Sequence, residues 1–536
     1  MDEINTKWLP HLTEEIVSEI ENNYLDAYVI ALEGWRRGLT LKWHVKDSEK
    51  FKEMKTWFVD EPGQLFSLHS DERSHYFFRT RGDKVTNEAV EKGMNKETTK
   101  RILAEKGVPV PAGREFTIEA TEAEILSYAN ELGYPVVIKP TDGSFGRGVM
   151  SDLTSDEEFK YALDYVRNEL EETNIIVEKH VDGKDYRLYV VDNEVVGAIL
   201  RIPPNITGDG INSIDALIDI KNKERGLNPR LSTTLIEVNK ELVDYIGRSG
   251  YTLQTVPEKG ELIYVSDKSN ISIGGDPIDV LDSLSAEMKQ LAVDALNAIP
   301  GLTHGAVDLM IETTTEGKEK GFIIELNPTA QLGGILFPLK GTPRDVPKAI
   351  IDYYFPETKG VYRSANHMYI DFKKILIPLY NNLATKIVVP NISINQFQSK
   401  KLTITGLFKD LDDKRKIKGY ALQNNLFGLI NEMEKETVEV IIAGKKTDLT
   451  NFEKSITEIL ALKIIDVKEW NKPLKASFQL KDGNHTFVKK INAQRNQLVT
   501  LQREEARLQK RHEQMLSSTS WRITAPIRRL TKLIKG

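Results

Sequence analysis

Apolar residues follow two kinds of spacing along the chain, and the change between them divides it into parts. Short β-branched runs bounded by Gly- or Pro-containing turns gather between residues 93 and 356, which predicts strands there. Residues 1–92 mix helical spacing with short apolar runs, and residues 357–397 form a less patterned connector. A compact alternation of helices and strands follows at 398–480, and the polar stretch 485–536 predicts a long helix. The pattern therefore predicts a five-part α+β chain.

The clearest strand pair lies late in the strand-rich part. Two β-rich runs, 304–312 and 321–327, flank a polar turn with two glycines, so we expect a hairpin. We expect Glu312 to pair with Gly321, which fixes the register of the two strands.

In that register two carboxylates face each other. Asp308 lies directly opposite Glu325, and Asn327, two residues on, shares the face of Glu325. Opposed side chains have Cβ atoms about 4.5–5.5 Å apart, so two carboxylates there repel. A divalent cation between them removes the repulsion, and a set of oxygen donors suits Mg²⁺. An exposed acidic strand pair is the alternative, but the apolar neighbours of these residues favour the metal.

A lysine ends another buried run. The run 135–139 reads "PVVIK" and predicts a strand, and the loop "TDGSFGRG" follows it. Backbone N–H groups of a Gly-rich loop approach phosphate oxygens closely, and Lys139 would add a point charge. An ordinary hairpin with an exposed lysine head is the other interpretation.

Upstream, "MNKETTKRILAEKGVPVP" predicts a helix with Asn95 as its N-cap and Gly107 at its end. Lys96 lies in the first turn, where a cation opposes the helix dipole, so its position calls for another reason. A solvated surface lysine is equally compatible with the local pattern.

Downstream, "NIIVEKHVDGKDYRLYVV" predicts a strand, a turn at Asp182-Gly183 and a second strand. Glu178 ends the first run, where an acid needs a specific partner, and Asp185 begins the second. Such a pair of acceptors would suit the exocyclic amine and the ribose of a nucleotide, although acids are also common at strand ends.

Composition narrows the class of protein. The net charge of −6 gives no basic field for nucleic acid, and the chain has no cysteine for disulfides, thiolate metal sites or nucleophiles. No apolar run approaches the roughly 20 residues that span a bilayer. The acidic start "MDEINTKWLPHL" lacks the apolar core of a signal peptide. We therefore expect a cytoplasmic protein.

Taken in order, these motifs resemble the ATP-grasp superfamily, and in particular the ATP-grasp part of cyanophycin synthetase and of bifunctional glutathione synthetases. The resemblance covers about 93–356 and includes "VVGAILRIPPNITGDGINSIDALI" and "FPLKGTPRDVPKAIIDYYFP". It implies the ATP-grasp fold, in which two antiparallel α+β subdomains clasp ATP. Residues 1–92 would then be a pre-ATP-grasp domain.

The resemblance also implies roles for single residues. Asp308, Glu325 and Asn327 would hold Mg²⁺, and Arg187 and Arg201 would act near the phosphates or the acyl substrate as catalytic residues. The implied ATP-binding residues are Lys96, Lys139, Ser144, Gly146, Arg147, Gly148, Glu178, Lys179, Val181 and Asp185, of which Ser144 to Gly148 would form a closing loop.

By the same resemblance, the chain would be an ATP-dependent ligase that joins a carboxylate to an amine through an acylphosphate. The expected partners are ATP, a carboxylic acid and an amine such as an amino acid, in a homo-oligomer. The chain lacks the halves that accompany this domain in the resembled enzymes, so neither of their products is assumed. Two other functions stay open: an ATP-binding regulatory or scaffold protein with a vestigial ligase site, and an ATP-grasp kinase.

A second resemblance covers about 398–480, where "ALQNNLFGLI" and "TVEVIIAG" resemble segments of the acylphosphatase family. It implies a small ferredoxin-like sandwich. In place of the family's phosphate loop this chain has "KDLDDK" as a loop, with Lys414 for the arginine and Glu432 for the catalytic asparagine. We therefore expect an inactive module, and an unrelated α/β module remains the alternative.

The ending "SSTSWRITAPIRRLTKLIKG" is similar to tails of enzymes that build bacterial surface polysaccharides. Its five cations and its helically spaced isoleucines and leucines suit peripheral contact with an anionic membrane. Docking on a partner is the alternative.

Overall fold

The computed structural model describes residues 8–20, 22–141, 148–360, 365–392, 396–406, 411–434 and 437–481. The chain forms two compact units. The first unit runs to Phe397 and includes Lys472–Ala476, and the second contains Gln398–Asn471 and the chain from Ser477 onward. All sites discussed below lie in the first unit.

The N-terminal part of the first unit is a five-stranded sheet packed on helix α2. The strand order is β17-β1-β2-β3-β4, and β1, β2 and β3 pair antiparallel. Large aromatic side chains such as Trp43 and Phe66 fill the core between sheet and helices. The elements are α1 (Glu14–Val17), α2 (Asn22–Arg36), β1 (Thr40–His44), a 3₁₀ turn (Glu49–Lys52), β2 (Leu65–His69), β3 (Ser74–Phe78), β4 (Arg81–Gly82), α12 (Phe372–Tyr380) and β17 (Lys386–Val388).

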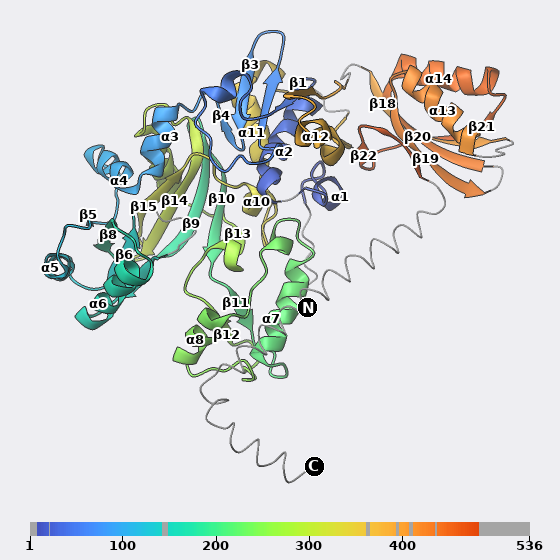
Figure 1. Cartoon of the computed structure of the whole chain (residues 1–536). Coiled ribbons are helices and arrows are strands. Elements are labelled where there is room, and N and C mark those ends of the chain that lie inside the picture. The colour runs from blue at the N-terminus through green and yellow to red at the C-terminus, as the bar shows by residue number, and fades with distance from the viewer. Residues whose placement is uncertain are drawn as a thin grey trace, which may run out of the picture. The chain divides into compact units, whose positions relative to one another are not determined.

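A small antiparallel sheet of order β5-β8-β6-β7 follows, with α5 and α6 packed on one face (Figure 1). Its core is made by apolar residues that alternate along the strands, such as Val136 and Ile138. The elements are β5 (Gly113–Phe116), α5 (Glu122–Leu132), β6 (Val136–Pro140), β7 (Met150–Leu153), α6 (Asp156–Asp164), a π-helical turn (Tyr165–Glu169) and β8 (Ile175–Lys179).

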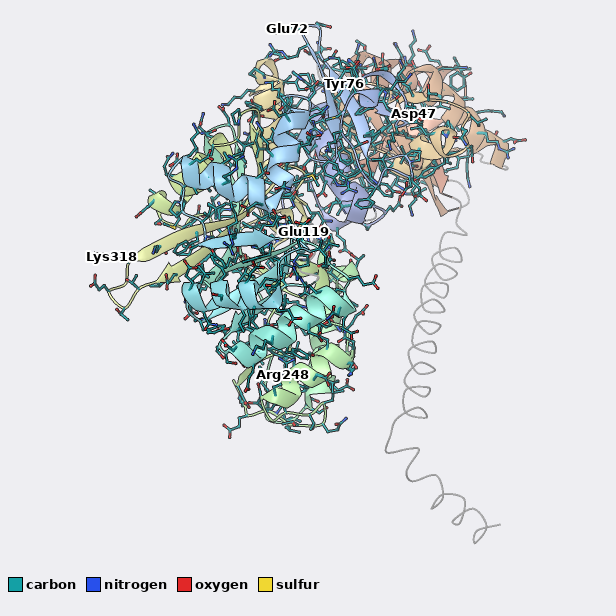
Figure 2. The ribbon with its side chains drawn as sticks, turned by 60° about the vertical axis from the view of Figure 1, so that its left-hand side comes forward. Asp47, Glu72, Tyr76, Glu119, Arg248 and Lys318 are labelled. Atoms are coloured by element: carbon teal, nitrogen blue, oxygen red, sulfur yellow. The ribbon has the colours of Figure 1, made fainter. Side chains whose placement is uncertain are left out.

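The larger antiparallel sheet has the order β13-β10-β9-β14-β15, and α9 covers one face of it. Helices α3 and α4 connect the N-terminal part to the small sheet (Figure 1). The hairpin β14–β15 ends in a polar turn, and in Figure 2 Lys318 points outward from that turn. The elements are α3 (Asn87–Met94), α4 (Lys96–Glu105), β9 (Lys184–Val191), β10 (Glu194–Ile202), β13 (Asp276–Asp279), α9 (Ala286–Asn297), β14 (His304–Thr313), β15 (Glu319–Asn327), α10 (Gly333–Leu336) and α11 (Val346–Tyr354).

Between β10 and β13 the chain builds a separate small cluster around Ile214 and Ile246. Its elements are β11 (Asn205–Thr207), α7 (Ile214–Arg225), α8 (Lys240–Arg248) and β12 (Leu262–Tyr264), with 3₁₀ turns at Leu231–Thr233 and Ile271–Ile273. The first unit also contains a 3₁₀ turn (Pro356–Thr358) and the parallel pair β16 (Met368–Tyr369) and β22 (Leu474–Lys475).

The second unit is a sheet of order β21-β18-β20-β19-β23 with two helices, in the chain order strand, helix, strand, strand, helix, strand, strand. Its relation to acylphosphatases stays a prediction. The elements are β18 (Phe397–Thr405), α13 (Leu411–Gln423), β19 (Phe427–Glu434), β20 (Thr437–Lys445), α14 (Lys446–Glu458), β21 (Lys463–Glu469) and β23 (Phe478–Lys481).

One expectation for this second unit is wrong. Asp412, Asp413 and Lys414 were expected in a loop, but α13 begins at Leu411 and contains all three. Acids in a first turn complement the helix dipole, which accounts for the difference. Asp412 also pairs with Arg415 at 2.8 Å. The side chain of Glu432 and the expected helix and tail at 485–536 lie outside the described residues.

The expected α+β class with antiparallel sheets is confirmed. Within the described ranges, none of the helices has both the length and the apolar character needed to cross a membrane.

Candidate active site

Lys139, the lysine at the end of β6, belongs to a buried group of three charges. Val137 faces Glu178 across β6 and β8, so Lys139, two residues on, points to the same side as Glu178. Lys139 Nζ lies 2.5 Å from Glu178 Oε1, and Lys100 Nζ lies 2.7 Å from Oε2. All three residues are between 4% and 7% exposed. We call this group the Lys–Glu–Lys triad.

The triad holds one positive charge more than it neutralises. Burial alone raises the pKa of the Glu178 carboxyl, but the ammonium groups of Lys139 and Lys100 outweigh burial and hold that pKa below its ordinary value. A buried surplus cation is stabilised by an anion, and phosphate oxygens would supply one. The predicted roles of Lys139 at phosphates and Glu178 at adenine stay predictions. In this structure both oxygens of Glu178 accept from lysines.

Lys100 was not predicted, although the sequence carried a signal for it. It lies four residues after Lys96 in α4, so both side chains lie on one helix face. Asn95 caps this helix as expected, its side chain accepting from Thr98 N. Lys96 Nζ lies 3.3 Å from the Pro140 carbonyl oxygen, and its charge also acts on the Glu325 carboxyl. One helix face therefore serves both sheets.

The hairpin β14–β15 brings Asp308 opposite Glu325, as expected. The expected pairing of Glu312 with Gly321 is wrong by one residue, because Gly321 pairs with Ile311. A β-bulge between the two sites accounts for both results. Asp308 pairs with Glu325 but Leu309 pairs with Ile323, which leaves Ile324 as the extra residue of β15.

Asp308 also pairs with Arg187 on β9, so Arg187, Asp308 and Glu325 form a row across three strands. We call these three residues the carboxylate row. Arg187 donates two parallel hydrogen bonds to Asp308, from Nε to Oδ1 at 2.7 Å and from Nη2 to Oδ2 at 2.8 Å. Arg201 Nη2 lies 3.0 Å from Oδ2. Burial raises the pKa of Asp308, but the two guanidinium groups outweigh it and lower that pKa to about 2.

Glu325 differs sharply from its neighbour. Burial and the Asp308 charge raise the pKa of the Glu325 carboxyl. Among the described residues none donates a hydrogen bond to it or forms an ion pair with it. The carboxylate row therefore contains one acid held by two arginines and one acid that still needs a cation.

The donor set fits Mg²⁺. A carboxylate has about four acceptor positions, so the three bonds to Asp308 leave one, and Glu325 keeps all of its own. Asn327 follows on the same strand face, and its Oδ1 accepts from Thr329 N at 3.1 Å. No group of three His, Asp or Glu side chains surrounds one point anywhere in the described part of the chain. The predicted ligand set therefore consists of two carboxylates and one amide.

Asp185, predicted at the ribose, lies opposite Arg201 across β9 and β10. Its Oδ1 accepts from Arg201 Nη2 at 2.5 Å and its Oδ2 accepts from the Ser269 hydroxyl. Arg201 therefore joins Asp185 to Asp308. Both predicted catalytic arginines, Arg187 and Arg201, lie at the carboxylate row, and their roles remain predictions.

Other predicted residues lie around the triad. Lys179 Nζ donates to the carbonyl oxygens of Gly133 and Tyr134 at 2.7 and 3.0 Å, so this side chain holds the turn before β6. Val181 lies half-buried between β8 and β9. Gly148 has φ +71°, and a Cβ there would lie 2.8 Å from Pro140 Cγ, so only glycine fits. Ser144, Gly146 and Arg147 lie outside the described residues.

Comparison with known proteins agrees with this geometry. Residues 93–208 match the family described as the RimK-like ATP-grasp domain. The chain is similar to cyanophycin synthetase of Trichormus variabilis, with 36% identity over 285 residues, 52% of this chain and 31% of that protein. It is similar to the glutathione biosynthesis bifunctional protein GshAB of Enterococcus faecalis, with 33% identity over 317 residues, 57% of this chain and 41% of that protein. The chain thus spans less than half the length of these relatives.

Among solved structures, a bifunctional glutathione synthetase from Pasteurella multocida matches at 28% identity with a TM-score of 0.42, covering 55% of this chain and 41% of that one. The ATP-grasp ligase PsnB complexed with its minimal precursor, Mg and ADP matches at 15% identity with a TM-score of 0.30, covering 50% and 60%.

The expected cofactors, ATP and Mg²⁺, are those that ATP-grasp ligases use. The matched segment contains the triad, Arg187 and Arg201. Asp308 and Glu325, the two carboxylates predicted to hold Mg²⁺, lie outside it on the same sheet as the two arginines. Over residues 93–208 this chain therefore matches a RimK-like ATP-grasp domain.

Proposed function

We propose that the protein is an ATP-dependent carboxylate–amine ligase, which converts ATP, an acid and an amine into an amide, ADP and phosphate through an acylphosphate. The observation that carries the proposal is the carboxylate row, in which Glu325 forms no ion pair with any described residue, beside an Asp308 fixed by two arginines. The amide-forming names of the relatives support the same reaction class.

In this proposal each charged group has one task. Lys139 and Lys100 offer their surplus charge to the phosphates, and Lys96 reaches toward the same space from the helix end. Arg187 and Arg201 keep Asp308 ionised and fixed, so that Asp308, Glu325 and Asn327 could hold Mg²⁺. Mg²⁺ held there would neutralise charge on the transferring phosphoryl group. The protein's share is to position the acid and the phosphates and to balance their charge.

The tail-like sequence extends the proposal to the substrates. An amino acid as the amine, and a surface-glycan or peptide precursor as the acid, would suit an enzyme that works near a membrane. Assembly as a homo-oligomer belongs to the same proposal.

The test is product formation. Purified protein, MgATP, a panel of acids and either an amino acid or hydroxylamine are mixed, and ADP and product mass are measured. We expect ADP release to need both acid and amine, with a product lighter by one water than the sum of the two. A stable phosphorylated acid formed without the amine would indicate the kinase instead. Nucleotide binding with no turnover across the panel would indicate the regulatory protein.

A further inference from the structure

A buried arginine without a full set of partners lies in the segment after α7, outside the residues that match the family. Arg230 is 6% exposed. Its Nη2 donates to Gln331 Oε1 at 3.0 Å, but its Nη1 is fully covered and has no acceptor among the described residues. A guanidinium stays charged, so a buried N–H of this kind left without an acceptor is costly. An acceptor for Arg230 Nη1 would therefore be stabilising, and none of the described residues supplies one.

The side chain of Arg230 packs against Gly333. A Cβ on residue 333 would lie 2.3 Å from Arg230 Cδ, so the stem of Arg230 rests directly on Gly333. Gly333 is the first residue of α10, and this helix directly follows the loop that continues from Asn327, the predicted metal ligand. The Leu332 N–H of this loop donates to Asp26 Oδ1 at 2.8 Å. This short loop and the start of α10 therefore fix Arg230, Asp26 and Asn327 relative to one another.

The surroundings of Arg230 carry surplus positive charge. Arg79 and Arg230 both act on the buried carboxyl of Asp26, yet neither forms an ion pair with it within 4.0 Å. Arg79 instead donates from Nε to Gln64 Oε1 at 2.7 Å. Two guanidinium groups therefore share one acid. We call Asp26, Arg79, Arg230 and Gln331 the Arg230 cluster.

The pKa values support this assignment of charge. Burial raises the pKa of Asp26 to about 6, and the hydrogen bond from Leu332 N and the charges of Arg230 and Arg79 only partly reverse that rise. Burial lowers the pKa of Arg230, the Asp26 carboxylate partly opposes this, and the charge of Arg187 lowers it further. The cluster is thus a buried site in which an added anion would be favoured.

Arg187 connects this cluster to the carboxylate row. It acts on Arg230, and both of its forked bonds are taken by Asp308. Consider an acid substrate whose reacting carboxylate lies at the carboxylate row. A second anionic group of that substrate would therefore accept from Arg230, because the forked hydrogen bonds of Arg187 are already taken. Gln331 is exposed, so the cluster is open toward solvent on one side.

We infer that Arg230, with Arg79 and Gln331 beside it, binds a second anionic group of the acid substrate, so that this substrate is a dicarboxylate. The inference rests on the proposed ligase function. Arg230 would be a specificity-determining residue. A hydrogen bond to a charged group of this kind changes affinity about 10- to 100-fold.

The first test separates a binding role from a structural one. The melting temperature of ligand-free Arg230→Met is compared with that of Arg225→Met, a matched buried arginine whose Nη1 lies 2.7 Å from Asp276 Oδ1. We expect Arg225→Met to melt lower than the wild type and Arg230→Met to melt level or higher. A loss at Arg230 as large as that at Arg225 would make Arg230 structural and overturn the inference.

The second test measures the preference itself. Dicarboxylates from malonate to adipate and their monomethyl esters are titrated by calorimetry into protein saturated with MgADP. We expect at least one dicarboxylate to bind the wild type about 10- to 100-fold more tightly than its ester, and Arg230→Gln to bind both equally. MgADP affinity, the control, should be equal in the two proteins.

The outcomes separate the inference from the function on which it rests. No preference for any dicarboxylate in the wild type, or a preference retained by Arg230→Gln, overturns the assignment of Arg230 even if the protein forms amides. A preference lost with Arg230, in a protein that forms no amide, supports the assignment and removes the ligase.

Discussion

The small sheet and the larger sheet next to it in sequence carry surplus charge of opposite sign at their charged sites. The Lys–Glu–Lys triad on the small sheet combines two cations with one acid. On the larger sheet, Arg187 and Arg201 meet three acids, Asp185, Asp308 and Glu325. The first site therefore has a surplus cation and the second a surplus acid.

This difference shows how a chain can prepare for a ligand that carries both signs. An isolated buried charge costs free energy. In each site the partners neutralise all charges except one, which is a cation in the triad and an acid on the larger sheet. In the proposed function, MgATP would bring phosphate oxygens for one site and a cation for the other. Lys96 reaches both sites from one helix, so the two halves are coupled through α4.

The largest expected effect comes from the acids of the larger sheet. Glu325→Gln and Asp308→Asn should each lower ligase turnover by more than about 100-fold. Substitution of residues that only support a metal ligand lowers activity by about 100-fold at most, so a direct ligand should show a larger loss. Their stabilities should differ. Glu325→Gln removes a carboxylate whose pKa is raised, so the ligand-free protein should melt level or higher. Asp308→Asn leaves Arg187 without its acidic partner and Arg201 with Asp185 alone, and should cost about 3–5 kcal/mol. Equal melting temperatures in the two variants would contradict the expected difference between Asp308 and Glu325.

On the small sheet, Glu178→Gln should destabilise the ligand-free protein by about 3–5 kcal/mol, because Lys100 and Lys139 would remain buried without an anion. ATP should restore more stability to this variant than to the wild type, since phosphate supplies the missing charge. Thermal unfolding with and without MgATP measures both effects. An unchanged melting temperature without ligand would contradict a surplus cation in the triad.

The Arg230 cluster adds a third buried acid. The pKa of Asp26 rises from its ordinary value of 3.8 to about 6, which corresponds to about 3 kcal/mol. A raised pKa gives stability that is present below pH 3.8 and is lost as the pH rises through 6. Asp26→Asn keeps an acceptor for Leu332 N but no charge. The variant should match the wild type in unfolding free energy at about pH 3, below the unfolded pKa, and exceed it by about 3 kcal/mol at about pH 8. A constant difference between these two pH values would rule out this ionisation.

The smallest effect is expected at Lys100. Lys100→Met leaves the Lys139–Glu178 pair intact and removes only the surplus charge. The protein should fold normally, with an ATP affinity about tenfold weaker and an unchanged affinity for free adenosine. Calorimetry of both ligands checks this expectation. Equal losses for adenosine and ATP would mean that Lys100 supports the fold of the site rather than the phosphates.

The sequence predicted what depends on local rules. Asn95 caps α4 because a side-chain acceptor at that position satisfies the free N–H groups of the first turn. The hairpin and the opposition of Asp308 to Glu325 followed from strand alternation. The bulge at Ile324 could not be predicted, because nothing in an apolar run shows which of its residues will have no pairing partner on the neighbouring strand.

Long-range pairings were beyond the sequence for a different reason. Lys139 and Glu178 were each interpreted as ligands of ATP, yet their adjacency across β6 and β8 makes them partners of each other. The Arg230 cluster gathers residues from four distant segments, and none of them carries a motif. The loop residues Ser144, Gly146 and Arg147 stay as predicted and untested.

The bulge in β15 also limits how the gene can change over time. If Ile324 took a regular place in the ladder set by the turn, Val307 rather than Asp308 would lie opposite Glu325, and Glu325 and Asn327 would turn to the opposite side of the sheet from Asp308. Loss of the Ile324 codon would instead make the ladder regular, with Glu325 directly after Ile323 and still opposite Asp308. Lineages that keep this chemistry should therefore accept a one-residue deletion at Ile324 far more readily than one at Leu326, which would turn Asn327 to the opposite face from Glu325.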